Sequence, residues 1–159
     1  MNYLNINKKK NEETANALNT LLADYHLYYQ KLRNFHWNIV GKHFFDLHTK
    51  FEELYEDAKL KIDEIAERIL TLRYQPLSNY SQYMELSNIA EASTNLKDYE
   101  MVQNIIEDHG ILLSQMRKVL ENAEKANDDG TMDSIGTYIA EIEKVNWMLD
   151  AWASTNEDS

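Results

Sequence analysis

Two histidines and three carboxylates stand at spacings that could place them around a metal ion. His36 precedes His48 by twelve residues, and Asp63 and Glu67 follow at intervals of fifteen and four. Residues four apart project from one side of a helix, so Asp63 lies beside Glu67, and His48 lies beside Glu52. Imidazole and carboxylate ligands together suit Fe(II) and Zn(II), and a site with open coordination positions suits redox iron. The pattern therefore predicts a candidate metal centre.

Helix geometry limits how these residues can meet. His48 and Asp63 are fifteen residues apart on one predicted helix, which is roughly 22 Å at 1.5 Å per residue. They cannot bind the same ion within one chain, whereas His36 lies just across a turn at Gly41 and can approach His48. If all four ligands bind one metal, the histidines of one chain must meet the carboxylates of another. A two-fold contact would then create two equivalent sites.

A structural interpretation of the same residues remains open. Asp63 and Glu67 could be surface carboxylates in ion pairs with Lys59 and Arg68. No Glu is followed three residues later by His, so the usual intrachain pattern of di-iron carboxylate bundles is absent. A lone histidine in a helical protein is more often structural than a ligand, and this applies to the three histidines outside the pattern: His26, His43 and His109.

The elements that must position these residues are four amphipathic helices. Apolar residues recur at steps of three and four in four runs, within residues 15–35, 47–69, 96–120 and 135–152. Short links at Gly41 and Gly130 predict two antiparallel hairpins. The stretch between them, residues 72–94, is long enough to cross the bundle and could hold a short helix at residues 81–86. This predicts an all-α, ferritin-like four-helix bundle with a long crossover, although any other four-helix bundle stays possible.

Composition agrees with a single helical domain. The chain has 159 residues, 43% of them hydrophobic, and only four Gly and one Pro, which favours long uninterrupted helices. A net charge of −11 repels phosphate backbones and attracts cations. There is no cysteine, no apolar stretch long enough for a membrane span and no secretory signal pattern. We expect a cytoplasmic protein with an arm at residues 1–13, a bundle at 14–155 and a short tail at 156–159.

Three segments resemble the Dps family of miniferritins within the ferritin-like superfamily. They are residues 34–41, residues 44–48 and residues 62–68, which read NFHWNIVG, FFDLH and IDEIAER. The order His, twelve on to His, fifteen on to Asp and four on to Glu is similar to the ferroxidase pattern of that family. The resemblance covers nearly the whole chain, including the acidic turn before the last helix.

The resemblance implies a function and an assembly. Members of the family form hollow dodecamers that oxidise Fe(II), preferentially with hydrogen peroxide, store ferric iron and so protect against oxidative stress. Carried over, His36 and His48 would bind iron from one subunit, and Asp63 and Glu67 from its two-fold partner. Glu52 would be a weaker ligand that assists a second iron, giving a di-iron centre.

The resemblance also assigns roles to residues near the site and at the pores. Trp37 would take up oxidising equivalents, with simple packing as its alternative role. Asp128, Asp129 and Asp133 would concentrate cations at three-fold pores; turn formation and helix capping are an equally good role for them, and the two roles do not exclude each other.

DNA binding is the property on which the chain departs from many members of the family. Its arm carries Lys8, Lys9 and Lys10, but two glutamates follow at once and each subunit is strongly acidic. We therefore expect weak or no DNA binding at physiological salt. Two other classes stay open: a nucleoid-compacting protein with secondary iron chemistry, and a passive iron-binding shell or bundle without a redox role. The acidic composition argues against the first.

Overall fold

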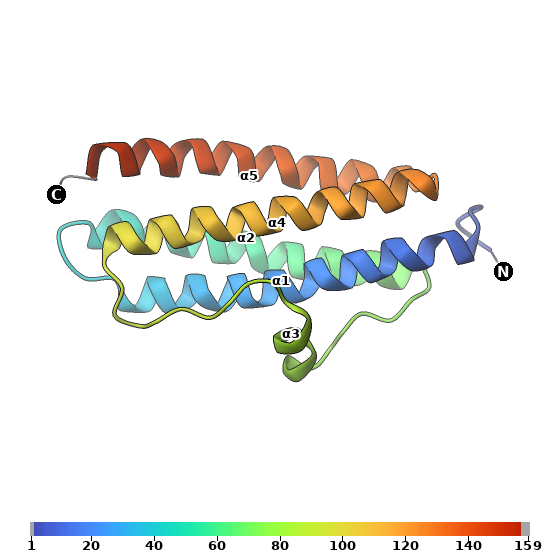
Figure 1. Cartoon of the computed structure of the whole chain (residues 1–159), viewed down its shortest axis with the longest axis horizontal. Coiled ribbons are helices and arrows are strands. Elements are labelled where there is room, and N and C mark those ends of the chain that lie inside the picture. Colours follow the sequence, from blue (N-terminus) through green and yellow to red (C-terminus); the bar gives the residue numbers. More distant parts are fainter. Residues whose placement is uncertain (1, 157–159) are drawn as a thin grey trace.

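Four long helices form an elongated bundle in the computed structural model, which describes residues 2–156 (Figure 1). They are α1 (Asn11–Asn38), α2 (Phe44–Thr71), α4 (Asp98–Lys125) and α5 (Asp129–Asn156), with a short α3 (Tyr80–Leu86) and a 3₁₀ turn, η1 (Lys8–Lys10). No strand occurs among these described residues. The predicted all-α class is confirmed.

The chain runs as two antiparallel hairpins joined by a crossover. Helices α1 and α2 form the first hairpin, α4 and α5 form the second, and α1 also packs on α4. The connection from α2 to α4 runs along the outside of α1 and carries α3 against it (Figure 1). Helix α3 begins at Tyr80, one residue before the predicted start, because Asn79 and Gln82 form a capping box there.

Local sequence sets both hairpin turns. Gly41 has φ +101°, a conformation that a residue without a Cβ adopts at little cost. At the other turn Asn127 takes a left-handed φ of 56°, which asparagine tolerates better than most residues. The backbone N–H of Thr131 then donates to Asp128 Oδ1 (3.1 Å), so Asp128 caps the start of α5. The first turn brings the start of α2 back beside the end of α1.

The core is made by the apolar stripes that the sequence predicted. Phe35 of α1 and Phe51 of α2 are fully buried, with ring centroids 5.8 Å apart. They lie close to His36 and His48 in the chain, so the packed centre of the first hairpin fixes the helix segments that carry the two histidines. The candidate ligands therefore stand on a rigid scaffold rather than on a loop.

Polar side chains join α2 to α5 along much of their length. The Arg68 guanidinium contacts Asp128 at 2.6 Å, and Lys61 Nζ contacts Glu141 at 2.6 Å. Between these two contacts Tyr138 donates to Glu64, and towards the end of α5 Trp152 Nε1 donates to Asp46 at 3.1 Å. Charge-assisted hydrogen bonds of this kind fix the relative position of two helices.

The N-terminal segment contacts the end of α2. The Tyr3 hydroxyl donates to the Thr71 carbonyl (2.7 Å), and the Tyr74 hydroxyl donates to the Lys8 carbonyl (2.9 Å). Helix α1 begins at Asn11, three residues before the predicted boundary of the bundle. Whether residues 1–13 act as a flexible arm stays a prediction, and Met1 and residues 157–159 of the predicted tail lie outside the described part of the chain.

His109 is expected to make the protein sensitive to acid. Its ring is buried, takes a hydrogen bond from the Tyr28 hydroxyl (2.7 Å) and pairs with Asn146 Oδ1 (2.5 Å). Burial lowers the pKa of His109 from 6.5 to about 4, so folding favours the neutral ring. The contribution of the neutral His109 ring to the free energy of unfolding is complete above pH 6.5. It decreases by about 3 kcal/mol as the pH falls towards 4. Urea unfolding at several pH values should show this loss.

The variant His109→Gln provides the comparison. It removes the titrating ring, so its stability should fall less steeply between pH 6.5 and 4 even if it is lower at neutral pH. Burial raises the pKa of Asp108 to about 6, an effect of opposite sign that both proteins share. An equally steep loss in His109→Gln would show that His109 does not cause the sensitivity.

Candidate metal centre

His36 and His48 bind each other's backbone in a reciprocal pair. His36 Nδ1 lies 2.7 Å from the His48 carbonyl oxygen, and His48 Nδ1 lies 2.7 Å from the His36 carbonyl oxygen. Their rings are stacked, with centroids 3.7 Å apart and planes 14° from parallel. The turn at Gly41 brings the two residues together, as the sequence analysis predicted. Both rings are therefore fixed in position and orientation before any ligand binds.

These hydrogen bonds also fix which nitrogen of each ring carries the proton. A carbonyl oxygen only accepts, so each Nδ1 must be the protonated donor. The lone pair of each Nε2 is then free to bind a metal ion. Metal-binding histidines commonly use this arrangement, in which the second nitrogen donates to a carbonyl and orients the ring. The donor set thus fits an ion such as Fe(II).

Aromatic side chains enclose the histidine pair on two sides. Phe44 stacks on the His48 ring with centroids 4.8 Å apart, and Tyr55 sets its edge against the His36 ring at 5.3 Å. The His36 side chain is buried, whereas Trp37 beside it in sequence is exposed. The histidine pair is therefore packed against aromatic rings on the protein side.

The carboxylates do not join this pair within the chain. His48 and Asp63 both lie on the unbroken helix α2, so the separation of roughly 22 Å holds. Asp63, Glu67 and Glu52 are exposed. No group of three or more potential ligands converges anywhere within residues 2–156. Within one chain the histidine pair and the carboxylates are therefore separate groups, and the joint role of the five residues stays a prediction.

The competing interpretation relied on Arg68 and Lys59 as ion-pair partners. Arg68 is engaged elsewhere: its guanidinium donates to Asp128 (2.6 Å) and to the Thr131 hydroxyl (2.9 Å). Across the described residues, no ion pair links Asp63 or Glu67 to a cation. Both carboxylates are therefore available to a partner outside the chain.

One predicted pore residue has a different role. The Asp128 carboxylate is 2% exposed and is taken up by Arg68 and by the start of α5, so the prediction that it lines a pore is wrong. The position of Asp128 in the sequence, next to a turn, suited both pore lining and helix capping. In the structure Asp128 caps α5, because Arg68 of α2 reaches its carboxylate. Asp129 and Asp133 are exposed, and their role at a pore stays a prediction.

Replacing Asp128 should cost stability, and replacing its neighbour should not. Asp128→Asn removes the charge that holds Arg68 and weakens the cap, so the free energy of unfolding should fall by about 1–2 kcal/mol. Asp129→Asn, one residue further on, is the matched control and should change it by less than about 0.5 kcal/mol. Chemical denaturation measures both. Equal losses of stability in the two variants would show that the contacts of the buried Asp128 carboxylate with Arg68 and the start of α5 are not the cause of the loss.

The remaining histidines have structural surroundings. His26 is stacked on Tyr83 with centroids 3.8 Å apart, and burial lowers its pKa to about 4. His43 lies 3.4 Å from Asp46 and packs on Trp152. With His109 in the core, none of the three joins the His36–His48 pair. Whether His36 and His48 bind metal stays a prediction.

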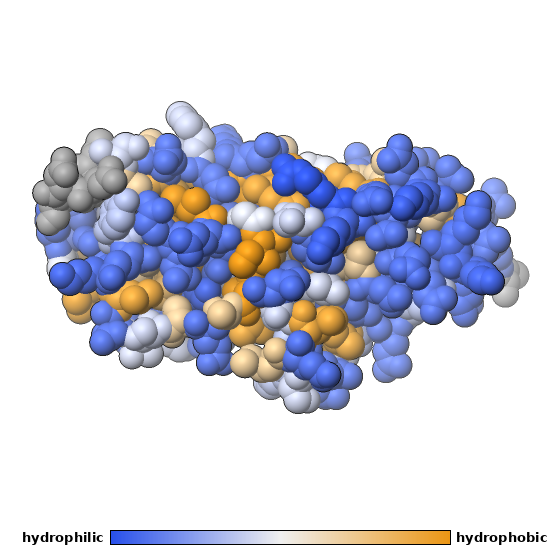
Figure 2. Space-filling model, viewed as in Figure 1, coloured by the Kyte–Doolittle hydropathy of each residue, from blue (hydrophilic) through white to orange (hydrophobic). Residues whose placement is uncertain are grey.

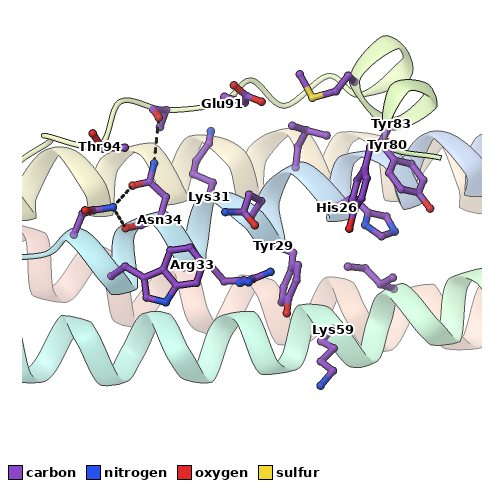
Figure 3. A pocket seen from close by; sticks show the side chains of 17 residues that line it. His26, Tyr29, Lys31, Arg33, Asn34, Lys59, Tyr80, Tyr83, Glu91 and Thr94 are labelled. Atoms are coloured by element: carbon purple, nitrogen blue, oxygen red, sulfur yellow. Dashed lines mark hydrogen bonds between the residues drawn. The ribbon is translucent and has the colours of Figure 1, made fainter. Parts of the chain in front are cut away.

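A large cavity lies on the surface of the first hairpin, and its lining includes Trp37, the sequence neighbour of His36. It has a volume of about 810 Å³, and its lining comes from α1, α2, α3 and the crossover. Figure 3 shows Tyr29 and Arg33 on its α1 wall, with Tyr80 and Tyr83 at the α3 end and Lys59 across from them on α2. Figure 2 shows hydrophobic residues gathered near the middle of the face that carries α3. Exposed apolar surface of this kind commonly marks an interaction site.

Sequence reasoning missed two residues beside the site. Tyr55 follows His48 by seven residues and Glu52 by three, which places all three on one helix face; that spacing could have revealed it. Arg33 lies between the rings of Tyr29 and Trp37, at 5.2 and 4.8 Å from their centroids. Its spacing of four residues from each is visible in the sequence, but nothing there distinguishes it from an ordinary surface arginine.

Comparison with known proteins identifies relatives of this chain. A family model for the ferritin-like domain matches residues 15–157. An uncharacterized protein of Haemophilus influenzae is 42% identical over 152 residues, covering 96% of this chain and 95% of that protein. DNA protection during starvation protein 2 of Bacillus anthracis is 39% identical over 142 residues, covering 89% and 97%.

Solved structures agree with these sequence matches. A Dps protein from Vibrio cholerae O1, described as a member of a broad superfamily of ferritin-like diiron-carboxylate proteins, superposes with a TM-score of 0.92 at 44% identity, covering 96% of each chain. A Dps protein from Bacillus brevis gives 0.88 at 36% identity, covering 91% of this chain and 97% of that one. None of the helices in residues 2–156 has the length and apolarity of a membrane span.

Proposed function

Because the chain belongs to the Dps family of ferritin-like proteins, we propose that it oxidises Fe(II) at sites shared between two subunits and stores the ferric product. The observation that carries this proposal is the reciprocal His36–His48 pair, in which each Nδ1 is bound to a carbonyl and each Nε2 is free. Iron is substrate and cargo here. The product is held inside a hollow shell, which we take to be the family's dodecamer.

The second half of each site comes from a two-fold partner. Asp63 and Glu67 are exposed, lack ion pairs within the described chain and share one side of α2. The lining of the cavity of about 810 Å³ includes Trp37, the sequence neighbour of His36, and Ile62, the sequence neighbour of Asp63. A second copy packed on this apolar surface about a two-fold axis would close both sites at once.

The residues of the site perform separable tasks. The histidines bind Fe(II) in a fixed orientation, and the partner's carboxylates neutralise its charge and complete the donor set. Glu52, one turn after His48, assists a second iron, which makes a di-iron centre. Few protein ligands leave coordination positions open for hydrogen peroxide, the preferred oxidant. Two Fe(II) then give one electron each, and peroxide takes up two protons to leave two waters.

The stoichiometry of two Fe(II) per peroxide explains how the protein protects against oxidative stress as well as how it stores iron. Two-electron reduction of peroxide releases no hydroxyl radical, so the reaction removes both Fe(II) and peroxide and limits oxidative stress. The acidic surface, with a net charge of −11 per chain, draws cations towards the shell. The acidic surface also repels the phosphate backbone of DNA, so we expect weak or no DNA binding. We place the protein in the cytoplasm.

The proposal is tested by adding Fe(II) and hydrogen peroxide to the purified protein without oxygen. Optical absorbance follows oxidation, and size-exclusion chromatography with iron detection then locates the product. Consumption of two Fe(II) per peroxide, with ferric iron eluting at about twelve subunits, is the expected result. Iron that oxidises and precipitates at the rate seen in buffer would contradict it.

A passive iron-binding shell is the main alternative function. It would take up ferric iron without accelerating its formation. Asp63→Asn separates the two, because only a ferroxidase loses its oxidation rate while the shell persists. Glu121→Gln, which changes an exposed carboxylate paired with Lys125 on α4, is the matched control and should keep the wild-type rate.

A further inference from the structure

Two positive side chains flank the exposed carboxylates Asp63 and Glu67 on α2, and both are bound by acidic partners at α5. Lys61 Nζ, two residues before Asp63, contacts Glu141 at 2.6 Å, and the Lys61 side chain is 5% exposed. Arg68, the next residue after Glu67, is bound at the start of α5. A free cation on a helix pairs with a carboxylate within one turn of it. The contacts with α5 therefore withdraw the charges that would compete with a metal ion on α2.

The Arg68 guanidinium lies in a holder made by Asp128, Gly130 and Thr131. Its Nη2 donates to Asp128 Oδ1 at 2.6 Å, and its Nε donates to Thr131 Oγ1 at 2.9 Å. The Thr131 hydroxyl in turn donates to Asp128 Oδ2 at 2.5 Å. Asp128 and Thr131 are 2% and 1% exposed. The holder is therefore a buried, charge-assisted network that is complete within one chain.

Gly130 leaves the space that the guanidinium occupies. A Cβ atom at position 130 would lie 2.9 Å from Arg68 Nη2 and 3.2 Å from Arg68 Cζ, so any side chain there would push the guanidinium away. At Gly136, six residues further along α5, an added Cβ would meet nothing within 4 Å. The two glycines therefore offer a matched pair of positions at which a methyl group either does or does not disturb the holder.

A guanidinium released from the holder has room to reach Glu67. Arg68 and Glu67 line the same groove between α2 and α5, which has a volume of about 390 Å³. Glu64, four residues before Arg68 on the same helix, also lines this groove, but it already accepts a hydrogen bond from the Tyr138 hydroxyl. Guanidinium and carboxylate groups form strong, often bidentate pairs. Released Arg68 would therefore occupy the Glu67 oxygens that a metal ion needs.

We propose that Asp128, Gly130 and Thr131 are positioning residues for the metal site, which keep Arg68 away from Glu67 so that this carboxylate stays available to Fe(II). The inference rests on the proposed ferroxidase function and deepens it. The three residues act through Arg68 and do not touch the metal. A positive charge at ion-pair distance would offset the attraction of the carboxylate for a cation. The holder thus sets the affinity for Fe(II) and leaves the later chemistry unchanged.

The first test measures peroxide-driven oxidation by assembled Gly130→Ala protein over a range of Fe(II) concentrations. The added methyl group displaces the guanidinium without changing any charge, so KM for Fe(II) should rise about tenfold. The value of kcat should stay within about twofold of the wild type, because an effect on binding alone changes KM. Gly136→Ala, which adds the same methyl group to open space on the same helix, should keep the wild-type KM.

A rescue experiment separates this role from a merely structural one. Asp128→Asn removes the charge that holds the guanidinium, so KM should rise as in Gly130→Ala. Adding Arg68→Gln removes the released cation, so the double variant should return to the wild-type KM while having the net charge of the wild type. A structural role predicts the opposite, because the double variant loses more contacts than Asp128→Asn alone.

Co(II) binding without oxygen or peroxide, followed by visible absorption, makes the same comparison without oxidation. The Kd should rise in Gly130→Ala and Asp128→Asn, and it should recover in the double variant. Wild-type KM and Kd in both single variants, or no recovery in the double variant, would overturn the role of the holder while iron oxidation continues. Wild-type protein that oxidises iron no faster than buffer would overturn the proposed ferroxidase, a result that the Co(II) titration distinguishes from failure of the holder.

Discussion

The variant His36→Ala is expected to oxidise Fe(II) with peroxide at least about tenfold more slowly than the wild type, approaching the rate in buffer. The substitution removes one of the two free Nε2 donors and also the ring that stacks on His48 at 3.7 Å, although the residue 36 carbonyl that accepts from His48 Nδ1 remains. Both histidine ligands are therefore affected by one change. Stopped-flow absorbance measures the rate.

The controls separate loss of a ligand from loss of the fold. His26→Phe removes an imidazole from the same helix but keeps a ring stacked on Tyr83, so its rate should stay close to the wild type. Size-exclusion chromatography should find both variants assembled. A His36→Ala shell that is intact and oxidises iron at the wild-type rate would exclude His36 as a ligand.

The largest expected change in stability comes from a buried ion pair between α1 and α4. Lys31 Nζ lies 2.8 Å from Asp108 Oδ2, both side chains are about 95% buried, and Lys31 also donates to Asn104 Oδ1 at 2.9 Å. Asp108→Ala leaves the ammonium group buried without its charged partner. The free energy of unfolding should then fall by about 3–5 kcal/mol. Chemical denaturation at neutral pH measures it.

Removing both charges should be far less harmful. Burial raises the pKa of Asp108 to about 6, so protonation favours the folded state, and this contribution is lost as the pH rises from 3.8 through 6. The ionised pair is therefore costly at neutral pH. The double variant Lys31→Met with Asp108→Leu should lie within about 1–2 kcal/mol of the wild type. A double variant as unstable as Asp108→Ala would contradict this account.

An exposed pair of the same residue classes serves as the comparison. Lys125 and Glu121 lie 3.0 Å apart on the surface of α4, with side chains 69% and 67% exposed. Glu121→Ala should cost less than about 1 kcal/mol, because water replaces the lost partner. The contrast tests burial rather than charge as the source of the effect.

The sequence predicted the helices and the approach of the two histidines because both depend on local rules. Apolar spacing and scarce Gly and Pro determine the four long helices, and the Gly41 turn brings His36 beside His48. The separation of His48 from Asp63 follows from helix rise alone, and the continuous α2 preserves it.

What the sequence could not predict depends on contacts between distant helices. Asp128 looked equally suited to a pore and to a cap; only the position of Arg68, on another helix, decides between them. The stacking of Arg33 on Tyr29 and Trp37 depends on side-chain rotamers, which spacing does not specify. The same limit applies to the reciprocal histidine bonds, whose formation needs the exact approach of two backbones.

The measurement that tests the central claim most directly mixes two inactive variants. His36→Ala and Asp63→Asn subunits are unfolded together in equal amounts, refolded and assayed for peroxide-driven Fe(II) oxidation. A site built from two subunits needs its histidines from an Asp63→Asn chain and its carboxylates from a His36→Ala chain, so about a quarter of the sites should recover. A mixture no more active than either variant alone, although it assembles fully, would contradict a site shared between subunits.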